Sequence, residues 1–362
     1  MTRAKPKAAA PRRRSVAVLG ATGAVGQSFI RLLEHHPWFD LVAVAASERS
    51  AGKAYVDAAR WLGTEPMPDH VASMTVVPCD PKRVDAELVF SALDSSVATE
   101  VEAAFAGEGR FVLSNAKNYR MNPDVTLVIA EVNPDHLGIL EYQQRKRGWK
   151  GGIVTNGNCV AIVAALPLAP IHQRFGIKQV FVSTMQAVSG AGYPGVPSLD
   201  ILGNVIPYIA DEEPKIESEL QKFLGSALGD VIQPAPFVVS AHANRVPVEH
   251  GHTVCMSIAL ESKGKADDVA ACIAEWRGAP AARGLPSAPD HPLVLATYPD
   301  RPQPRLDVHA GGGMTVTVGR IRTDPLFDVK LVAIGHNVVR GAAGASVLNA
   351  ELLVTSGRVG LA

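Results

Sequence analysis

The segment that most constrains the fold is a short apolar run that leads into a glycine-rich turn. Ser15-Val16-Ala17-Val18-Leu19 has the pattern of a buried strand, and a helical pattern follows the turn through about Glu34. The turn itself comprises Gly20, Ala21, Thr22, Gly23, Ala24, Val25 and Gly26. Glycines permit a tight turn, and a helix that starts there directs unpaired N–H groups at a phosphate. This order predicts a dinucleotide site, although the spacing is GxxGxxG and an ordinary strand-to-helix turn is the alternative.

Further apolar runs of strand length occur along the first half of the chain. They occupy residues 41–46, 74–77, 88–93, 111–113 and 127–130, and a helical spacing occupies residues 97–105. Strands that alternate with helices predict an α/β fold with a doubly wound, parallel Rossmann sheet. Because ligands of such sheets bind at the carboxyl ends of the strands, we expect Ser91, Ala92 and Asn115 near the cofactor crevice.

The loop after the second predicted strand indicates which dinucleotide binds. A carboxylate near the end of this strand would hold the ribose 2′-hydroxyl of NAD. Here the strand ends in Ala46, and the following loop carries the hydroxyl and cationic side chains of Ser47, Arg49, Ser50 and Lys53. These groups can hold a 2′-phosphate, which favours NADP. Glu48 leaves NAD open, since a loop of mixed charge is often only solvated.

Cys159 lies where a short polar turn runs into an apolar segment of helical character. The N-terminus of a helix favours an anion, and its N–H groups can bond a thiolate or an oxyanion. We therefore expect the pKa of the Cys159 thiol to be lowered and the thiol to be nucleophilic. Asn158 adds an amide donor beside it. The alternative is that Cys159 is a small buried hydrophobic residue.

The second half of the chain contains β-rich segments and one loop with chemically versatile side chains. Residues 180–188 are β-rich and lead into a loop that begins Ser189-Gly190. Arg245, His250 and His252 lie close together before another strand-like run at residues 253–260. Arginine binds carboxylates and phosphates, and histidine exchanges protons near neutral pH.

The length and composition limit the number of domains and the kinds of partner that we expect. A chain of 362 residues with 47% hydrophobic and 19% charged residues suits about two globular domains. A formal net charge of +0 gives no reason to expect nucleic acid or a membrane as a partner. The four cysteines show no metal-ligand or disulfide spacing, which favours reduced thiols in the cytoplasm and no metal. Residues 1–14 are basic and predict a disordered tail, with a transit peptide as the alternative.

Several short motifs follow one another along the chain. They are GATGAVGQ (20–27), SERSAGK (47–53), SNAKNYRM (114–121), NGNC (156–159), QAVSGAGYPG (186–195), EEPK (212–215), RVPVEHGH (245–252) and NVVRGAAGASVLNAEL (337–352). In this order the chain resembles the aspartate-semialdehyde dehydrogenase family from about Ser15 to its C-terminus. The segments PSAP, RPQPRLD and GMTVTVGRIR are most similar to the archaeal and fungal branch.

The resemblance implies a fold like that of glyceraldehyde-3-phosphate dehydrogenase. We expect a Rossmann domain over residues 15–157, an α+β substrate and dimerisation domain over 158–335, and a C-terminal helix over 336–362 that returns to the first domain. The implied reaction is the reversible, NADPH-dependent reduction of L-aspartyl-4-phosphate to the semialdehyde and phosphate, through a cysteine thioester. It serves lysine, threonine and methionine biosynthesis, in a cytoplasmic homodimer or homotetramer.

The resemblance also implies a role for individual residues. Cys159 matches the nucleophile and His252 the acid/base, with Asn158 and the backbone N–H of Cys159 as oxyanion donors. Arg245 matches the group that pairs with the substrate carboxylate, and Glu212 the group that takes the substrate amine. The remaining matches are Lys215, Arg120 and Asn115 in the phosphate site, Gln186 as a substrate-orienting amide, and Asn337 as a cofactor contact beside Ser189 and Gly190.

Two positions depart from the family pattern. Gly157 stands where proline is usual, which predicts a looser turn before the nucleophile. His250 stands where an acidic residue is common, so it is expected to shift the pKa of His252 or to offer a rival base. Neither change removes an essential chemical group.

Two other functions stay open from the sequence. A reductase of a CoA thioester such as malonyl-CoA or succinyl-CoA would use the same cysteine, histidine and NADP site, but would need no phosphate site. A non-catalytic NADP-binding protein would need neither Cys159 nor His252.

Overall fold

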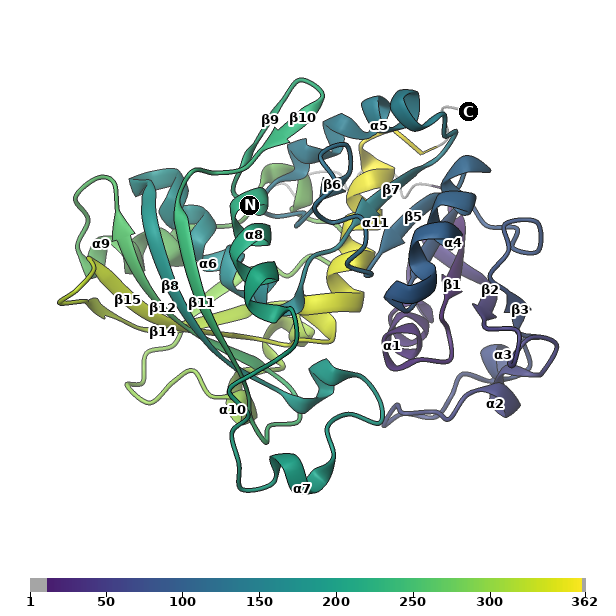
Figure 1. Ribbon diagram of the computed structural model, residues 1–362, viewed down its shortest axis with the longest axis horizontal. Coiled ribbons are helices and arrows are strands. Elements are labelled where there is room, and N and C mark those ends of the chain that lie inside the picture. The colour runs from purple at the N-terminus through teal and green to yellow at the C-terminus, as the bar shows by residue number, and fades with distance from the viewer. Residues whose placement is uncertain (1–11, 360–362) are drawn as a thin grey trace, which may run out of the picture.

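The computed structural model describes residues 12–359, which form two large β-sheets lying side by side and a small two-stranded one (Figure 1). Residues 1–11, most of the predicted tail, lie outside the described residues. The predicted tail also extends too far, because Arg14 is the first residue of β1 and its guanidinium pairs with Glu87 at 2.5 Å.

The first sheet is parallel throughout and has the order β3-β2-β1-β4-β5-β7-β6. Its strands are β1 (Arg14–Leu19), β2 (Phe39–Ala46), β3 (Val77–Pro78), β4 (Leu88–Ser91), β5 (Phe111–Ser114), β6 (Thr126–Leu127) and β7 (Gly152–Thr155). Of the strand expected at 74–77, only Val77 lies in a strand, because β3 comprises Val77 and Pro78. The predicted doubly wound sheet is confirmed.

Helices cover both faces of this sheet. The main ones are α1 (Ala24–Leu33), α4 (Ser95–Gly107), α5 (Leu140–Arg147) and α11 (Gly344–Thr355), and the short ones are α2 (Tyr55–Ala58) and α3 (Asp69–Ala72). Val347 and Leu348 of α11 join the same buried cluster as Val16 and Phe29, so the C-terminal helix packs on the first sheet. Figure 1 shows α11 beside β5 and β7.

The second sheet is mixed and has the order β11-β8-β12-β15-β14-β13. Its strands are β8 (Ile177–Gln186), β11 (Val238–Arg245), β12 (His252–Leu260), β13 (Leu293–Leu295), β14 (Val316–Thr323) and β15 (Val329–Gly335). One face packs on α6 (Cys159–Phe175), α8 (Glu212–Phe223) and α9 (Ala266–Glu275). The other face leaves Phe181 and Met185 of β8 exposed.

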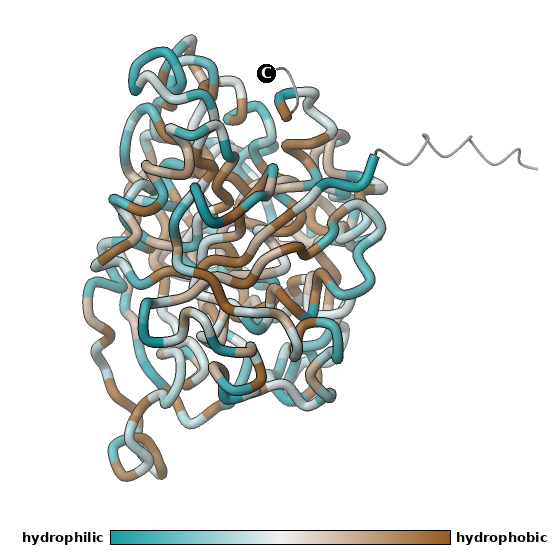
Figure 2. The backbone as a smooth tube through the Cα atoms, turned by 90° about the vertical axis from the view of Figure 1, so that its right-hand side faces the viewer, coloured by the Kyte–Doolittle hydropathy of each residue, from teal (hydrophilic) through white to brown (hydrophobic). Residues whose placement is uncertain are grey.

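A long excursion between β8 and α8 extends away from the body of the protein. It carries α7 (Ser198–Ile201) and exposes Leu199, Leu202 and Tyr208. In Figure 2 it is the loop that projects at the lower left, with apolar residues at its end. The remaining short elements are β9 (Ser226–Leu228), β10 (Val231–Gln233) and α10 (Pro304–Asp307). Within residues 12–359 no helix has the length and hydropathy to cross a membrane.

Candidate active site

Cys159 is the first residue of α6, as the sequence predicts. The helix begins there because Asn158 caps it, with Oδ1 accepting the backbone N–H groups of Val160 and Ala161 at 3.0 Å each. The other side of the cysteine is closed by Gly341, where an added Cβ would lie 2.5 Å from the Cβ of Cys159. Cys159 is thus held by a capped helix end and a glycine from the C-terminal segment.

His252 faces the cysteine from the start of β12 and is fully buried. Its Nε2 lies 3.0 Å from the Sγ of Cys159, and its Nδ1 accepts the backbone N–H of Ala187 at 3.1 Å. A nitrogen that accepts a hydrogen bond carries no proton, so the neutral ring carries its proton on Nε2, directed at the sulfur. His252 is therefore arranged to donate a hydrogen bond to a thiolate or an oxyanion.

Both members of this pair are held in their neutral forms. Burial raises the pKa of the Cys159 thiol to about 12, and the Glu212 carboxylate acts in the same direction, while Arg120 and Arg245 oppose it. Burial lowers the pKa of His252 to about 3, with Arg245 and His336 acting in the same direction. The predicted lowering of the thiol pKa by the helix N-terminus is therefore wrong for the unliganded protein, because burial and a carboxylate outweigh the helix.

Arg245 and Gln186 end two neighbouring parallel strands and are paired in register. The Nη1 of Arg245 donates to the carbonyl of Ala187 at 2.7 Å. At Gly190 an added Cβ would lie 2.9 Å from this Nη1 and 3.0 Å from Cε1 of His252. The sheet edge and the glycine loop thus bring all four predicted residues, Gln186, Gly190, Arg245 and His252, to one place.

Glu212 and Lys215 lie in the first turn of α8. Glu212 Oε1 accepts the side-chain amide of Asn158 at 2.9 Å, and Lys215 Nζ lies 3.6 Å from Oε2. One of the two N–H groups of the Asn158 amide is thus bound to Glu212, and the expected oxyanion role of this amide stays a prediction. The backbone N–H of Cys159, at the first position of the helix, has no intrahelical acceptor and fits the other expected donor.

Arg120 and Asn115 lie together behind the nucleophile turn. Arg120 donates from Nη1 to Glu219 Oε1 at 3.0 Å and from Nη2 to the carbonyl of Asn115 at 2.7 Å. The side chain of Asn115 is taken up by protein groups, since its Oδ1 accepts the amide of Asn156 at 3.0 Å. Arg120 thus fits an anion site, whereas Asn115 contributes its backbone carbonyl to holding the arginine.

The sequence reasoning missed Glu219. Its buried carboxylate contacts Arg120 and also accepts the backbone N–H of Asn158 at 2.5 Å. A signal for it exists, because Glu212, Lys215 and Glu219 follow the three-and-four spacing of one helix face. The spacing could not show which groups this face meets.

The glycine turn has the shape that a dinucleotide requires. Gly20 has φ +71°, and a Cβ there would lie 2.5 Å from the carbonyl of Ala92. A Cβ on Gly26 would lie 2.3 Å from the carbonyl of Gly20. Gly23 leaves the start of α1 without a side-chain cap, so the first N–H groups of the helix remain available for a phosphate.

The turn is held from outside by two side chains. Tyr55 donates to the carbonyl of Ala21 at 2.7 Å, and Gln27 donates to the carbonyl of Thr22 at 3.0 Å. On the loop after β2, Ser47, Arg49 and Lys53 are exposed, and within residues 12–359 the two cations form no ion pair. These residues fit the 2′-phosphate of NADP.

Ser189 and Asn337 form the other predicted cofactor contact. The amide of Asn337 donates to Ser189 Oγ at 2.8 Å, while its Oδ1 accepts the backbone N–H of Gly251 at 2.9 Å. They therefore join the loop after β8 to the segment after β15. Within the described part of the chain no cluster of three metal-ligating side chains is present.

Two family models match the chain. The semialdehyde dehydrogenase NAD binding domain matches residues 15–139, and the semialdehyde dehydrogenase dimerisation domain matches residues 168–340. An aspartate-semialdehyde dehydrogenase of Methanothermobacter thermautotrophicus is 53% identical over 342 residues, which are 94% of this chain and 98% of the relative. The chain belongs to the aspartate-semialdehyde dehydrogenase family.

Fungal members of the family are also similar to the chain. The enzyme of Schizosaccharomyces pombe is 45% identical over 95% of this chain and 99% of its own length. A crystal structure of the Candida albicans aspartate-semialdehyde dehydrogenase with NADP has a TM-score of 0.88 and 42% identity, and covers 95% of this chain and 99% of that one. The predicted family, including its archaeal and fungal relatives, and the predicted fold are confirmed.

The first departure from the pattern of the aspartate-semialdehyde dehydrogenase family, Gly157, packs against α8. An added Cβ on Gly157 would lie 2.2 Å from the ring of Phe223 and 3.1 Å from Glu219 Oε2. The ring of Phe223 occupies the space that a larger residue would fill, and the looser turn stays a prediction.

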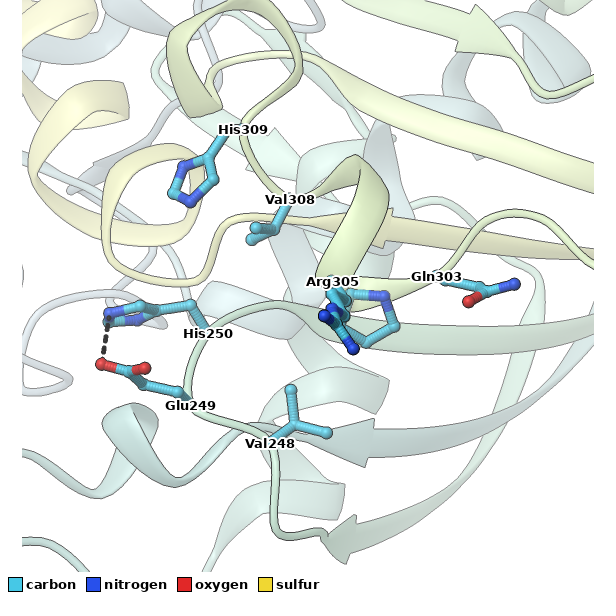
Figure 3. A pocket seen from close by; sticks show the side chains of 8 residues that line it. Val248, Glu249, His250, Gln303, Arg305, Val308 and His309 are labelled. Atoms are coloured by element: carbon cyan, nitrogen blue, oxygen red, sulfur yellow. Dashed lines mark ion pairs between the residues drawn. The ribbon is translucent and has the colours of Figure 1, made fainter.

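The second departure, His250, contacts Ser189 and two other histidines. Its Nδ1 lies 3.0 Å from Ser189 Oγ, and its ring centroid is 5.0 Å from that of His336. With His309 it lines a cavity of about 460 Å³ (Figure 3). The prediction that His250 shifts the pKa of His252 is wrong, since His336 is the histidine that lowers that pKa, whereas the role of a rival base stays a prediction.

Proposed function

We propose that the protein catalyses the reversible, NADPH-dependent reduction of L-aspartyl-4-phosphate to L-aspartate-4-semialdehyde and phosphate, in the biosynthesis of lysine, threonine and methionine. One observation carries the proposal. The Cys159–His252 pair, 3.0 Å apart, lies among groups suited to a substrate with a carboxylate, an ammonium and a phosphate. Family membership, with archaeal and fungal relatives that bear this enzyme's name, supports the same reaction.

The charged side chains assign the two ends of the substrate. The guanidinium of Arg245 suits the α-carboxylate, and the carboxylate of Glu212 suits the α-ammonium. Arg120 and Lys215 suit the phosphate. The acyl carbon between them would then face the sulfur of Cys159, and Gln186, at the end of the strand beside Arg245, would orient the substrate.

Cys159 carries the covalent chemistry. When the substrate binds, the thiol loses its proton to solvent, because Nε2 of His252 already carries one. The thiolate then attacks the acyl carbon, a carbon–sulfur bond forms, and the carbon–oxygen bond to phosphate breaks with its electrons on the departing phosphate. NADPH, when bound, supplies a hydride to the thioester carbon. The Nε2–H of His252 stabilises the oxyanion that develops, and collapse of the thiohemiacetal returns the thiolate and releases the aldehyde.

Substrate binding would itself favour the thiolate. Glu212 is one of the groups that raise the pKa of Cys159, and an ammonium beside this carboxylate cancels much of that effect. The same ammonium competes with the amide of Asn158 for Glu212 Oε1. Release of this amide would provide an additional donor next to the reacting carbonyl.

The proposed enzyme binds NADP and assembles as a dimer or tetramer. NADP would lie along the glycine turn from Gly20 to Gly26 and the loop from Ser47 to Lys53, with Ser91, Ala92, Ser189 and Asn337 near its other end. The match of residues 168–340 to a dimerisation domain supports a homodimer, and a pair of dimers would give a tetramer. The absence of disulfides among the described residues suits a cytoplasmic enzyme.

One assay tests the reaction. Reduction of NADP⁺ with L-aspartate-4-semialdehyde is measured with and without inorganic phosphate, and then with coenzyme A in its place. We expect a rate that depends on phosphate and does not respond to coenzyme A. A rate that requires coenzyme A would overturn the proposal in favour of a CoA-thioester reductase, and NADP binding without any turnover would favour a non-catalytic protein.

A further inference from the structure

Glu219 is a buried carboxylate to which neither the sequence pattern nor the proposed reaction assigns a role. It lies on α8, two turns after Glu212 and on the same face as Lys215. It is almost fully buried, so its charge must be compensated by neighbours.

Each oxygen of this carboxylate holds a different part of the site. Oε1 accepts a hydrogen bond from Arg120 Nη1 at 3.0 Å. Oε2 accepts the backbone N–H of Asn158 at 2.5 Å, in the residue just before the nucleophile. One rigid group therefore fixes the distance between the phosphate-site arginine and the turn that carries Cys159.

The rest of the arginine environment is built around this contact. The carbonyl of Asn115 takes Nη2 of Arg120, while the Nε of Arg120 is buried without a hydrogen-bond partner within the described chain. Lys222, one turn after Glu219, donates to the backbone carbonyls of Arg120, Asn122 and Val125 at 2.6–2.9 Å. Protein groups thus bond two of the five N–H groups of this guanidinium, and a phosphoryl oxygen would accept from those that remain.

We propose that Glu219 is a positioning residue that holds Arg120 and the turn before Cys159 in one arrangement, so that phosphate binding and sulfur attack meet at the same acyl phosphate. This inference rests on the proposed function, because it assigns the phosphate to Arg120. Glu219 touches neither the substrate nor the cofactor in this scheme and acts through the two groups that it holds.

The length and both oxygens of the side chain matter for this role. A glutamine keeps one acceptor oxygen but replaces the other with a donor, so it cannot satisfy Arg120 and the Asn158 N–H together. An aspartate keeps the charge but is shorter by about 1.5 Å and cannot reach both groups. If Glu219 acted only through its charge, removal of that charge would strengthen phosphate binding to Arg120 and aspartate would behave as wild type.

The test compares Glu219→Gln and Glu219→Asp with the matched control Glu217→Gln. Glu217 is on the same helix, and its carboxylate also accepts a backbone N–H, from Ala241 at 3.1 Å, away from the site. The dissociation constant of inorganic phosphate is measured by calorimetry on the NADP-bound protein. The steady-state constants kcat, KM for phosphate and KM for NADP⁺ follow from the oxidative assay.

We expect both Glu219 variants to weaken phosphate binding by about fivefold or more and to lower kcat, with KM for NADP⁺ unchanged within about twofold. Glu217→Gln should behave as wild type. Partial unfolding would lower kcat without changing phosphate affinity, so the affinity readout separates positioning from a purely structural role.

Three outcomes would overturn the inference: unchanged phosphate affinity in both variants, tighter binding in Glu219→Gln, or wild-type behaviour of Glu219→Asp. A wild-type protein that binds phosphate without phosphate-dependent turnover would instead contradict the proposed reaction and leave the positioning role supported by the binding data. A wild-type protein that binds no phosphate would overturn both.

Discussion

Helices α1 and α6 both begin where a strand of the first sheet ends, but different groups surround their N-termini. The start of α1 has glycines on its approach and no side-chain cap, so its N–H groups are available to a ligand. The start of α6 is capped by Asn158, and the carboxylates of Glu212 and Glu219 lie against that cap. The first arrangement can accept an anion from solution, whereas the second encloses a neutral thiol.

This difference shows that a helix N-terminus does not by itself decide the charge of the group placed there. The partial positive charge of about one half at a helix end is small beside the cost of burying a thiolate and the charge of Glu212. At α6 the helix fixes the position of Cys159, while burial, and after it the charge of Glu212, raises the pKa of the thiol. At α1 few groups compete with the helix, so its charge and its N–H groups can act on a phosphate.

The largest effect should follow from removing the sulfur. In Cys159→Ala we expect the phosphate-dependent rate to fall by about 10⁴-fold or more, because no thioester can form, while NADP binding is retained at α1. Turnover and NADP affinity are measured on the same preparation. Loss of NADP affinity together with activity would contradict the independence of the two helix ends.

Removal of the Glu212 charge should lower the pKa of the thiol at the start of α6. In Glu212→Gln the pKa of Cys159 should fall, because the Glu212 charge raises it, so the midpoint of iodoacetamide alkylation moves to lower pH. At the same time kcat/KM should fall by about 100-fold through loss of the ammonium partner. Glu213→Gln is the control, since that carboxylate accepts the backbone N–H of Ala243 at 3.0 Å. An unchanged alkylation midpoint in Glu212→Gln would refute this account of the thiol.

A methyl group added to the turn before α1 should weaken cofactor binding and leave the chemistry at Cys159 unchanged. In Gly20→Ala the new Cβ would approach the carbonyl of Ala92 to 2.5 Å at φ +71°, so we expect KM for NADP⁺ to rise by about tenfold or more. Gly148→Ala is the control, because Gly148 follows α5, outside the predicted cofactor site, and has φ +67° with nothing within 4 Å of an added Cβ. Equal effects of the two substitutions would mean that backbone strain, and not the shape of the turn, matters.

The smallest effect concerns Glu102 of α4, a buried carboxylate that bonds two strands of the first sheet. Glu102 accepts the hydroxyls of Ser91 and Ser114, which end β4 and β5, at 2.6 and 2.8 Å. Burial raises the pKa of Glu102 from 4.5 to about 7, although the two hydroxyls and the charge of Arg120 act to lower it. The folded protein therefore retains a proton that the unfolded chain loses, and the free energy of unfolding falls as the pH rises through this window.

We expect Glu102→Gln to remove this loss of stability. Its thermal midpoint should exceed that of the wild type at pH 8, for a gain on the order of 3 kcal/mol at most, and match it near pH 4.5. Glu100→Gln, an exposed neighbour on α4, is the control. Equal shifts at both pH values would show that Glu102 does not titrate in this way.

The sequence predicted the two regions unequally well. The glycine turn, the parallel sheet and the place of Cys159 follow from local patterns, namely an apolar run, a glycine spacing and a polar turn before a helix. The pKa of Cys159 and the role of Glu219 depend on α8, which begins more than fifty residues later in the chain. The fit of Phe223 over Gly157 likewise depends on tertiary packing that no local pattern contains.

Ala187 acts on this site through its main chain and not through its side chain. Its N–H fixes the proton of His252 and its carbonyl accepts Arg245, while its methyl group takes no part in either bond. A survey that truncates side chains will therefore miss this position. Among the twenty amino acids only proline removes the N–H. Because the methyl group of Ala187 is fully buried, only residues of similar size would fit there and still preserve the orientation of His252.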